Sequence, residues 1–267
     1  METTDFFRGS WGPRGGPPRA QTQLVTRTLL TFLLVMSGCN VNVFEPFEDT
    51  DTPEAHVEAG RMALDRGDYE RAIIELEHAN LQAPHQVPVL SDLASAYAGR
   101  AGMSFVGIAF AMQGVAAASD GTDQSFLSAI ASEKRMPKAD GAALTDLARA
   151  LAILSDDVPA DQVNDEIRVQ RAIVQLGHAA VTPLAIADLN RDRILQPEEL
   201  LFLSDDSLNA MVGDIRTANK DVKKVAQTRD LGGFTQRIDD ALATIAAQPG
   251  RTDAEKARMF VARQFAQ

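Results

Sequence analysis

The chain has 267 residues, a net charge of −11 and one cysteine, Cys39. A single cysteine excludes an intrachain disulfide and a zinc site built from several thiolates. The 37 acidic side chains outnumber the 26 basic ones, which excludes nucleic acid as a partner, because non-specific binding needs Lys and Arg at the phosphates. Few aromatic and β-branched residues among many Ala and Leu argue against an all-β fold.

An apolar segment near the N-terminus has the size of a signal-peptide core. Residues 29–36 are apolar except for Thr31, and Arg27 precedes them. The run is far shorter than the roughly 20 residues of a transmembrane helix. The small residues Ser37 and Gly38 follow it and fit a peptidase site.

The sequence Met36-Ser37-Gly38-Cys39 resembles the lipobox of bacterial lipoproteins, with Met36 in place of the usual Leu. The resemblance implies that residues 1–38 are a signal peptide, that the thiol of Cys39 is acylated, and that at least two acyl chains hold the protein on a membrane. Because Asn40 rather than Asp follows, we expect the outer membrane of a bacterial envelope, facing the periplasm. The alternative to lipidation is a buried cysteine. Separately, the long Gly- and Pro-rich stretch before Thr26 suggests a translation start near Val25.

The next two segments differ in their hydropathy pattern. Residues 39–52 are rich in acidic side chains and lack a helical period, which predicts a flexible tether. Residues 53–84 resemble a tetratricopeptide repeat (TPR), a helix–turn–helix of 34 residues. The matching positions are Gly60, Gly67, Tyr69, Ala72, Leu76, Ala79 and Pro84.

A second hairpin begins after Pro88, so TPR-like hairpins are predicted over 53–119. In the first hairpin, Gly60 allows close helix approach, and Tyr69 is expected to pack back over the turn. The helix of the second hairpin at 103–118 is apolar all round, which indicates a buried central helix; a membrane span is the alternative.

Residues 120–267 continue the helical pattern without a clear repeat. We therefore predict an all-α fold, in which TPR-like hairpins continue into a short α-solenoid or a compact helical bundle. The helices are expected near 122–134, 141–155, 161–187, 198–204, 206–226, 233–247 and 252–265.

Residues 188–199 resemble an EF-hand calcium loop, whose oxygen ligands wrap a hard cation. The resemblance implies six ligand positions. Side-chain oxygens would come from Asp188, Asn190, Asp192 and Glu199. Ile194 would supply its backbone carbonyl, and Gln196 would bind through a water.

One residue departs from the calcium-loop pattern. Arg193 stands where the loop bends sharply and the pattern has glycine, which costs on the order of 1 kcal/mol. Arg191 and Arg193 also place positive charge near the ion. The sequence therefore leaves three alternatives: a weak calcium site, a loop that keeps the turn without binding an ion, and a coincidental match.

The chain carries no recognisable catalytic motif, so we expect it not to be an enzyme. It lacks GxSxG, a phosphate-binding GxxxxGK[ST] loop and HExxH. The four histidines share no metal-binding spacing, and His178 is expected to be a paired core histidine.

The expected function is that of a membrane-anchored interaction scaffold in the envelope, with an unknown envelope protein or peptide as its partner. This expectation rests on the resemblance in fold. The alternative is a ligand-binding periplasmic accessory subunit of a solute transporter. The partner would contact Glu58, Arg61, Met62, Asp65, Ser91, Asp92 and Ser95.

Overall fold

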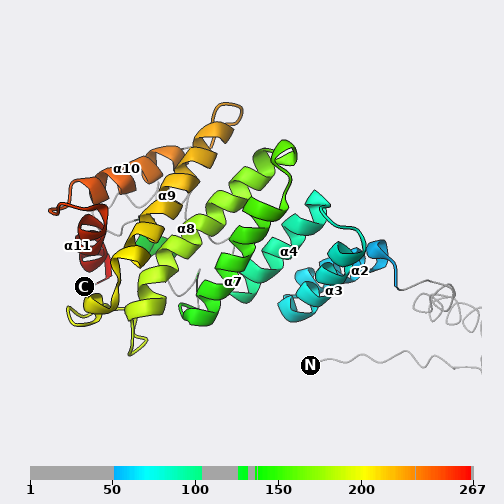
Figure 1. The fold of residues 1–267 in the computed structure, drawn as a ribbon, viewed down its shortest axis with the longest axis horizontal. Helices are drawn as coiled ribbons and strands as arrows, with labels where there is room; N and C mark the ends of the chain where they lie inside the picture. Colours follow the sequence, from blue (N-terminus) through cyan, green and yellow to red (C-terminus); the bar gives the residue numbers. More distant parts are fainter. Residues whose placement is uncertain (1–50, 104–125, 132–135, 137, 232, 266–267) are drawn as a thin grey trace, which may run out of the picture. The chain divides into compact units, whose positions relative to one another are not determined.

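The computed structural model describes residues 51–103, 126–131, 136, 138–231 and 233–265 (Figure 1). By its internal contacts the chain divides into two units, residues 1–49 and 50–267, and the described residues all belong to the second. The predicted all-α fold is confirmed, since the described ranges contain helices and no β-strand. No described helix is long and apolar enough to cross a bilayer.

Several predictions fall on residues outside the described ranges. They are the signal peptide at 1–38, the lipidation site Cys39, nearly all of the tether at 39–52 and the central helix expected over 103–118.

The first hairpin consists of α2, Pro53–Asp65, and α3, Tyr69–Gln82. The Thr52 hydroxyl caps α2 by accepting the amide of Ala55 at 3.2 Å. Gly67 makes the predicted turn with φ of 72°, a left-handed conformation that favours glycine.

Gly60 brings the two helices of this hairpin together, as expected. A Cβ atom at Gly60 would lie 2.6 Å from Cγ of Leu76, so only a hydrogen atom fits there. Three of the matching positions, Ala72, Leu76 and Ala79, form a stripe along α3 that is fully buried. The spacing of small and large residues therefore sets the approach of α2 to α3.

The third helix, α4, spans Val87–Arg100 and packs against α3. The ring of Tyr69 contacts the position where Gly99 of α4 would carry a Cβ atom. The ring of Tyr69 therefore packs on α4, a contact that was not predicted; its packing over its own turn stays a prediction. The absence of a side chain at Gly99 gives the ring a place on the next helix.

The remaining helices follow the predicted order with shifted ends. The expected helix at 141–155 turns into a π-helix after residue 152, the one at 161–187 begins only after Asn164, and the one at 198–204 is a single 3-10 turn. These elements are α6 (Phe126–Ile130), α7 (Gly141–Ala152), η3 (Ile153–Asp157), η4 (Ala160–Gln162), α8 (Asp165–Ala187), η5 (Glu199–Phe202), α9 (Asp205–Val225), α10 (Phe234–Ala246) and α11 (Asp253–Phe265).

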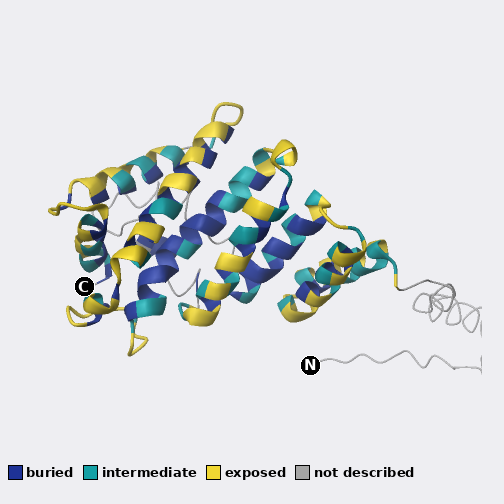
Figure 2. Cartoon of the chain, in the orientation of Figure 1, coloured by how far each residue is buried: buried dark blue, intermediate teal, exposed yellow. Residues whose placement is uncertain are grey.

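The helix α8 lies at the centre of the described part. It packs against α4, α6, α7 and α9, and Figure 2 shows buried residues along most of its length. A helix that is apolar on most faces must be covered on most faces. Because its neighbours among the described helices hold α8 in place, the loop that follows α8 begins at a fixed position.

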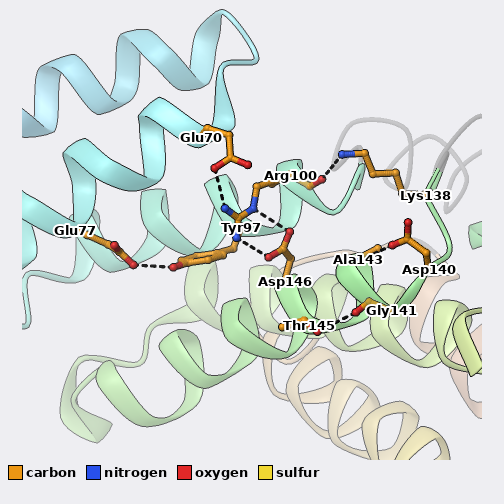
Figure 3. Close-up of polar contacts among 10 residues, drawn as sticks. All are labelled: Glu70, Glu77, Tyr97, Arg100, Lys138, Asp140, Gly141, Ala143, Thr145 and Asp146. Atoms are coloured by element: carbon orange, nitrogen blue, oxygen red, sulfur yellow. Dashed lines mark hydrogen bonds and ion pairs between the residues drawn. The ribbon is translucent and has the colours of Figure 1, made fainter.

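Polar contacts join α3, α4 and α7 (Figure 3). The Arg100 guanidinium donates to both carboxylate oxygens of Asp146, at 2.7 and 3.0 Å, and to Glu70 at 3.0 Å. The hydrogen bond from Arg100 to Asp146 is the largest of the effects that raise the pKa of Arg100. Beside it, the hydroxyl of Tyr97 donates to Glu77 at 2.6 Å, and burial raises the pKa of Tyr97. These polar side chains are paired with one another within the fold, which indicates a structural role.

Candidate functional site

A groove of about 320 Å³ lies between α2 and α4, and a part of α3 closes its floor. Buried or half-buried apolar side chains form the floor, and exposed residues, most of them polar, form the rim. The floor consists of Pro53, Val57, Ala79 and Val89, and the rim of Glu54, Glu58, Arg61, Gln86 and Pro88.

The charges on the rim are unequally paired. Nε of Arg61 donates to Oδ2 of Asp92 at 2.7 Å, and this ion pair ties α2 to α4 across the groove. Glu54 and Glu58 are exposed and have no ion-pair or hydrogen-bond partner for their side chains among the described residues. The rim therefore carries an uncompensated negative charge.

The structure brings some of the predicted partner-binding residues to this groove. Glu58 and Arg61 line it, and Asp92 reaches its rim through Arg61. Met62 and Asp65 are exposed on α2 but do not line the groove. They remain available on the surface beside it.

Two predicted partner-binding residues contact the central helix. The hydroxyl of Ser91 donates to Oε1 of Gln170 at 2.8 Å, and Nε2 of Gln170 donates to Oγ of Ser95 at 2.9 Å. Because Gln170 belongs to α8, these serines fasten α4 to the central helix. Their contact with a partner stays a prediction.

The sequence reasoning missed the two prolines of the groove. Pro53 is the first residue of α2 and Pro88 is the second residue of α4, positions where proline fits because the backbone N–H has no partner within the helix. The helices α2 and α4 are each the first helix of a predicted hairpin. A proline at the start of both was a signal that the two helix starts line the same groove. Both rings line the groove.

The second candidate is the loop 188–199, which leaves the C-terminal end of α8. Oδ1 of Asp188 accepts the amide of Asp192 at 3.2 Å, and Oδ2 accepts the amide of Arg193 at 2.8 Å. Oδ1 of Asp192 accepts the amide of Ile194 at 2.8 Å. These bonds wrap the backbone around the carboxylate of Asp188.

Glu199 closes the loop from its other end. Its side chain is buried, with Oε1 accepting the amide of Leu189 at 3.1 Å and Oε2 accepting the amide of Gln196 at 2.9 Å. A carboxylate that joins the first and last parts of a loop fixes both. Ile194 and Gln196, the other assigned ligand positions, are exposed.

Arg193 adopts the left-handed conformation expected at its position, with φ of 65°. Its guanidinium donates to the carbonyl oxygens of Ala131 and Met136, each at 2.7 Å. Charge-assisted bonds of this kind stabilise more than neutral ones and offset the backbone cost. Arg193, which stands where the calcium-loop pattern has glycine, therefore anchors the loop to the segment after α6.

The loop is also tied to the C-terminal helix. Leu195 is fully buried, and its amide donates to the carbonyl of Phe265 at 2.7 Å. The sequence shows no second calcium-type loop beside this one. The backbone N–H of Leu195 is therefore already paired with the end of α11.

The loop has oxygen ligands that suit calcium, but in the structure these side chains accept hydrogen bonds from backbone amides of the loop. Asp188, Asn190, Asp192 and Glu199 supply oxygen ligands of the type that a hard cation takes. Within the part of the chain that the structure describes, no three His, Cys, Asp or Glu side chains gather closely enough to hold a metal ion. Each carboxylate oxygen has two lone pairs, so one that accepts a backbone amide still has a lone pair for a cation.

Comparison with known proteins gives no relative. No protein-family model, no curated protein and no solved structure matches the chain.

Proposed function

We propose that the chain is a membrane-anchored interaction scaffold of the bacterial envelope, and that the groove between α2 and α4 receives its partner. The observation that carries this proposal is the groove itself, which contains Glu58 and Arg61, two residues assigned to partner binding on the sequence alone. Its apolar floor and charged rim match the anatomy of protein interfaces.

The experiment fills the groove. Val57 lines it and is half-buried on α2, so Val57→Trp places an indole in the space that a partner would use. The lipidated chain is cross-linked in envelopes, solubilised gently and purified. The proposal expects a partner at near-equal amount with the unchanged chain and its loss with Val57→Trp. Recovery of the same partner by both forms would contradict it.

The groove also gives some support to the alternative, a ligand-binding subunit of a solute transporter. Its volume of about 320 Å³ lies at the low end of the range for small-molecule pockets, roughly 300–1,000 Å³. Native mass spectrometry separates the two functions. A small molecule retained by the purified chain and lost in Val57→Trp would favour the alternative.

The membrane anchor rests on the lipobox resemblance at Cys39. Two acyl chains hold a protein stably on a bilayer, whereas one does not. We expect the intact mass of the membrane-extracted chain to correspond to residues 39–267 with acyl groups, and Cys39→Ala to abolish both processing and membrane retention. An unprocessed chain with a free thiol would overturn this assignment.

We propose further that the loop 188–199 binds calcium weakly and stabilises the C-terminal helices. The supporting observation is the arrangement of Asp188 and Glu199, which already close the loop at its two ends. A bound cation would use the lone pairs that the backbone N–H groups leave open on these carboxylates. Through Arg193 and Leu195 the loop is joined to the segment after α6 and to α11.

A further inference from the structure

The glutamates of the groove rim are placed at some cost to their own helix. Glu54 and Glu58 are four residues apart on α2, and like charges at this spacing destabilise a helix. Glu54 stands in the first turn, where the helix dipole favours a negative charge. Glu58 lies beyond that turn, and no described cation pairs with it. The helix dipole accounts for Glu54, whereas no described contact of the fold uses the side chain of Glu58.

The one cation of the rim does not neutralise them. Arg61 already donates to Asp92 at 2.7 Å, so its charge is matched within the rim. Counting the four charged groups gives three carboxylates against one guanidinium, a net charge of −2. A partner that brings positive charge to Glu54 and Glu58 would complete the pairing, and charge complementarity of this kind guides association and selects partners.

The size of the groove limits how much of a partner it receives. Its volume of about 320 Å³ lies at the low end of the range for binding pockets, so it accommodates only a few side chains of the partner. The apolar floor, with Val57 and Val89, takes a small apolar side chain.

From these observations we infer that the groove between α2 and α4 binds a peptide segment in which lysine or arginine side chains flank a small apolar residue. The basic side chains pair with Glu54 and Glu58, and the apolar side chain lies on the floor between them. This inference rests on the proposed scaffold function and names the chemistry of its partner.

The test uses three fluorescein-labelled peptides and the full chain. The first peptide is Ala-Val-Lys-Pro-Ala-Val-Lys-Pro-Ala, and the other two carry Gln or Glu in place of both Lys residues. Fluorescence anisotropy measures each Kd. From the strength of exposed ion pairs we expect the Lys peptide to bind about tenfold more tightly than the Gln peptide, and this ratio to shrink as salt is raised.

Two double variants locate the effect. Glu54→Gln/Glu58→Gln keeps the size of both side chains and should remove the tenfold preference for the Lys peptide. Asp161→Asn/Asp206→Asn removes two exposed carboxylates elsewhere and should leave the preference unchanged. An equal loss in both variants would show a general charge effect and overturn the inference.

The remaining outcomes separate this inference from the proposed function. If the Gln or Glu peptide binds as well as the Lys peptide, and Val57→Trp abolishes that binding, the groove is a peptide site but its charge selection is wrong. If no peptide binds the unchanged chain, the inference fails. If Val57→Trp also leaves the envelope partner bound, the proposed function fails with it.

Discussion

Arg171 and Asp221 form a two-point ion pair that fastens the central helix α8 to α9. Nε of Arg171 lies 2.7 Å from Oδ2 of Asp221, and Nη2 lies 2.9 Å from Oδ1. Only 17% of the arginine side chain and 5% of the aspartate side chain are exposed. The planar guanidinium matches both carboxylate oxygens at once, a geometry that lysine does not provide.

Breaking this pair should unfold the chain more easily than breaking an exposed one. Asp221→Ala leaves the Arg171 guanidinium buried without a carboxylate, which typically costs about 3–5 kcal/mol. Arg216→Ala removes the exposed pair with Asp253 and should cost less than about 1 kcal/mol. Urea unfolding of both variants measures the difference. Equal losses would contradict the structural role assigned to Arg171.

A pair of glycine substitutions tests the packing of the first hairpin. Gly60→Ala places a Cβ atom 2.6 Å from Leu76, whose burial leaves it little room to move, and we expect a loss of about 1–3 kcal/mol. Gly213→Ala in α9 meets nothing within 4 Å and should stabilise the helix by roughly 0.5–1 kcal/mol. Thermal unfolding compares the two. A neutral Gly60→Ala would mean that α2 and α3 lie further apart.

The stability of the first hairpin should depend on pH through His56. Nδ1 of His56 lies 2.8 Å from Glu75 and Nε2 lies 3.2 Å from Asp51, and the hydrogen bond to Glu75, followed by that to Asp51, raises the pKa of His56 above 6.5. A raised folded pKa means that the stabilisation is complete below the unfolded pKa of about 6.5 and is lost as the pH rises through the folded value.

The matching variant is His56→Gln, which keeps a polar side chain that does not titrate. We expect the difference in Tm between the unchanged chain and His56→Gln to be largest near pH 6 and to shrink toward about pH 8.5. A constant difference over this range would show that the contacts of His56 with Glu75 and Asp51 act without its charge.

Calcium should raise the Tm of the chain. For a Kd on the order of 0.5 mM, calcium at roughly 5 mM stabilises by about 1.4 kcal/mol, or about 3–6 °C. The double variant Asp188→Ala/Glu199→Ala should lose this increase relative to its own calcium-free Tm, whereas Asp206→Asn, which changes an exposed carboxylate outside the loop, should keep it. An unchanged Tm, or an equal increase in the double variant, would sink the calcium proposal.

Local features of the sequence were sufficient for much of the fold. Ser204 caps α9 by accepting the amide of Ser207, as its position before Asp205 and Asp206 indicates. His178, expected to be a paired core histidine, bonds Asp214 at 2.7 Å. Such features were predictable because caps and helical periods depend on residues a few positions apart.

The contacts that were not predicted join residues that are far apart in the sequence. Ser91 and Ser95 meet Gln170 across more than 70 positions, and no local period reports such a contact. Arg193 likewise finds the carbonyls of Ala131 and Met136, so a residue that looked like a defect in the loop is an anchor. Of the residues that line the groove, only Glu58 and Arg61 were predicted. Its prolines and its apolar floor come from three helices, whose packing the local pattern does not report.

The most direct test of the central claim is photo-crosslinking from single positions in intact envelopes. A benzophenone amino acid is placed at Gln86, an exposed residue of the groove rim, or at Leu81, which is 79% exposed near the end of α3 and does not line the groove. The scaffold account predicts one cross-linked partner from position 86, absent when Val57→Trp fills the groove, and none from position 81. Cross-links of equal yield from both positions, unaffected by Val57→Trp, would contradict it.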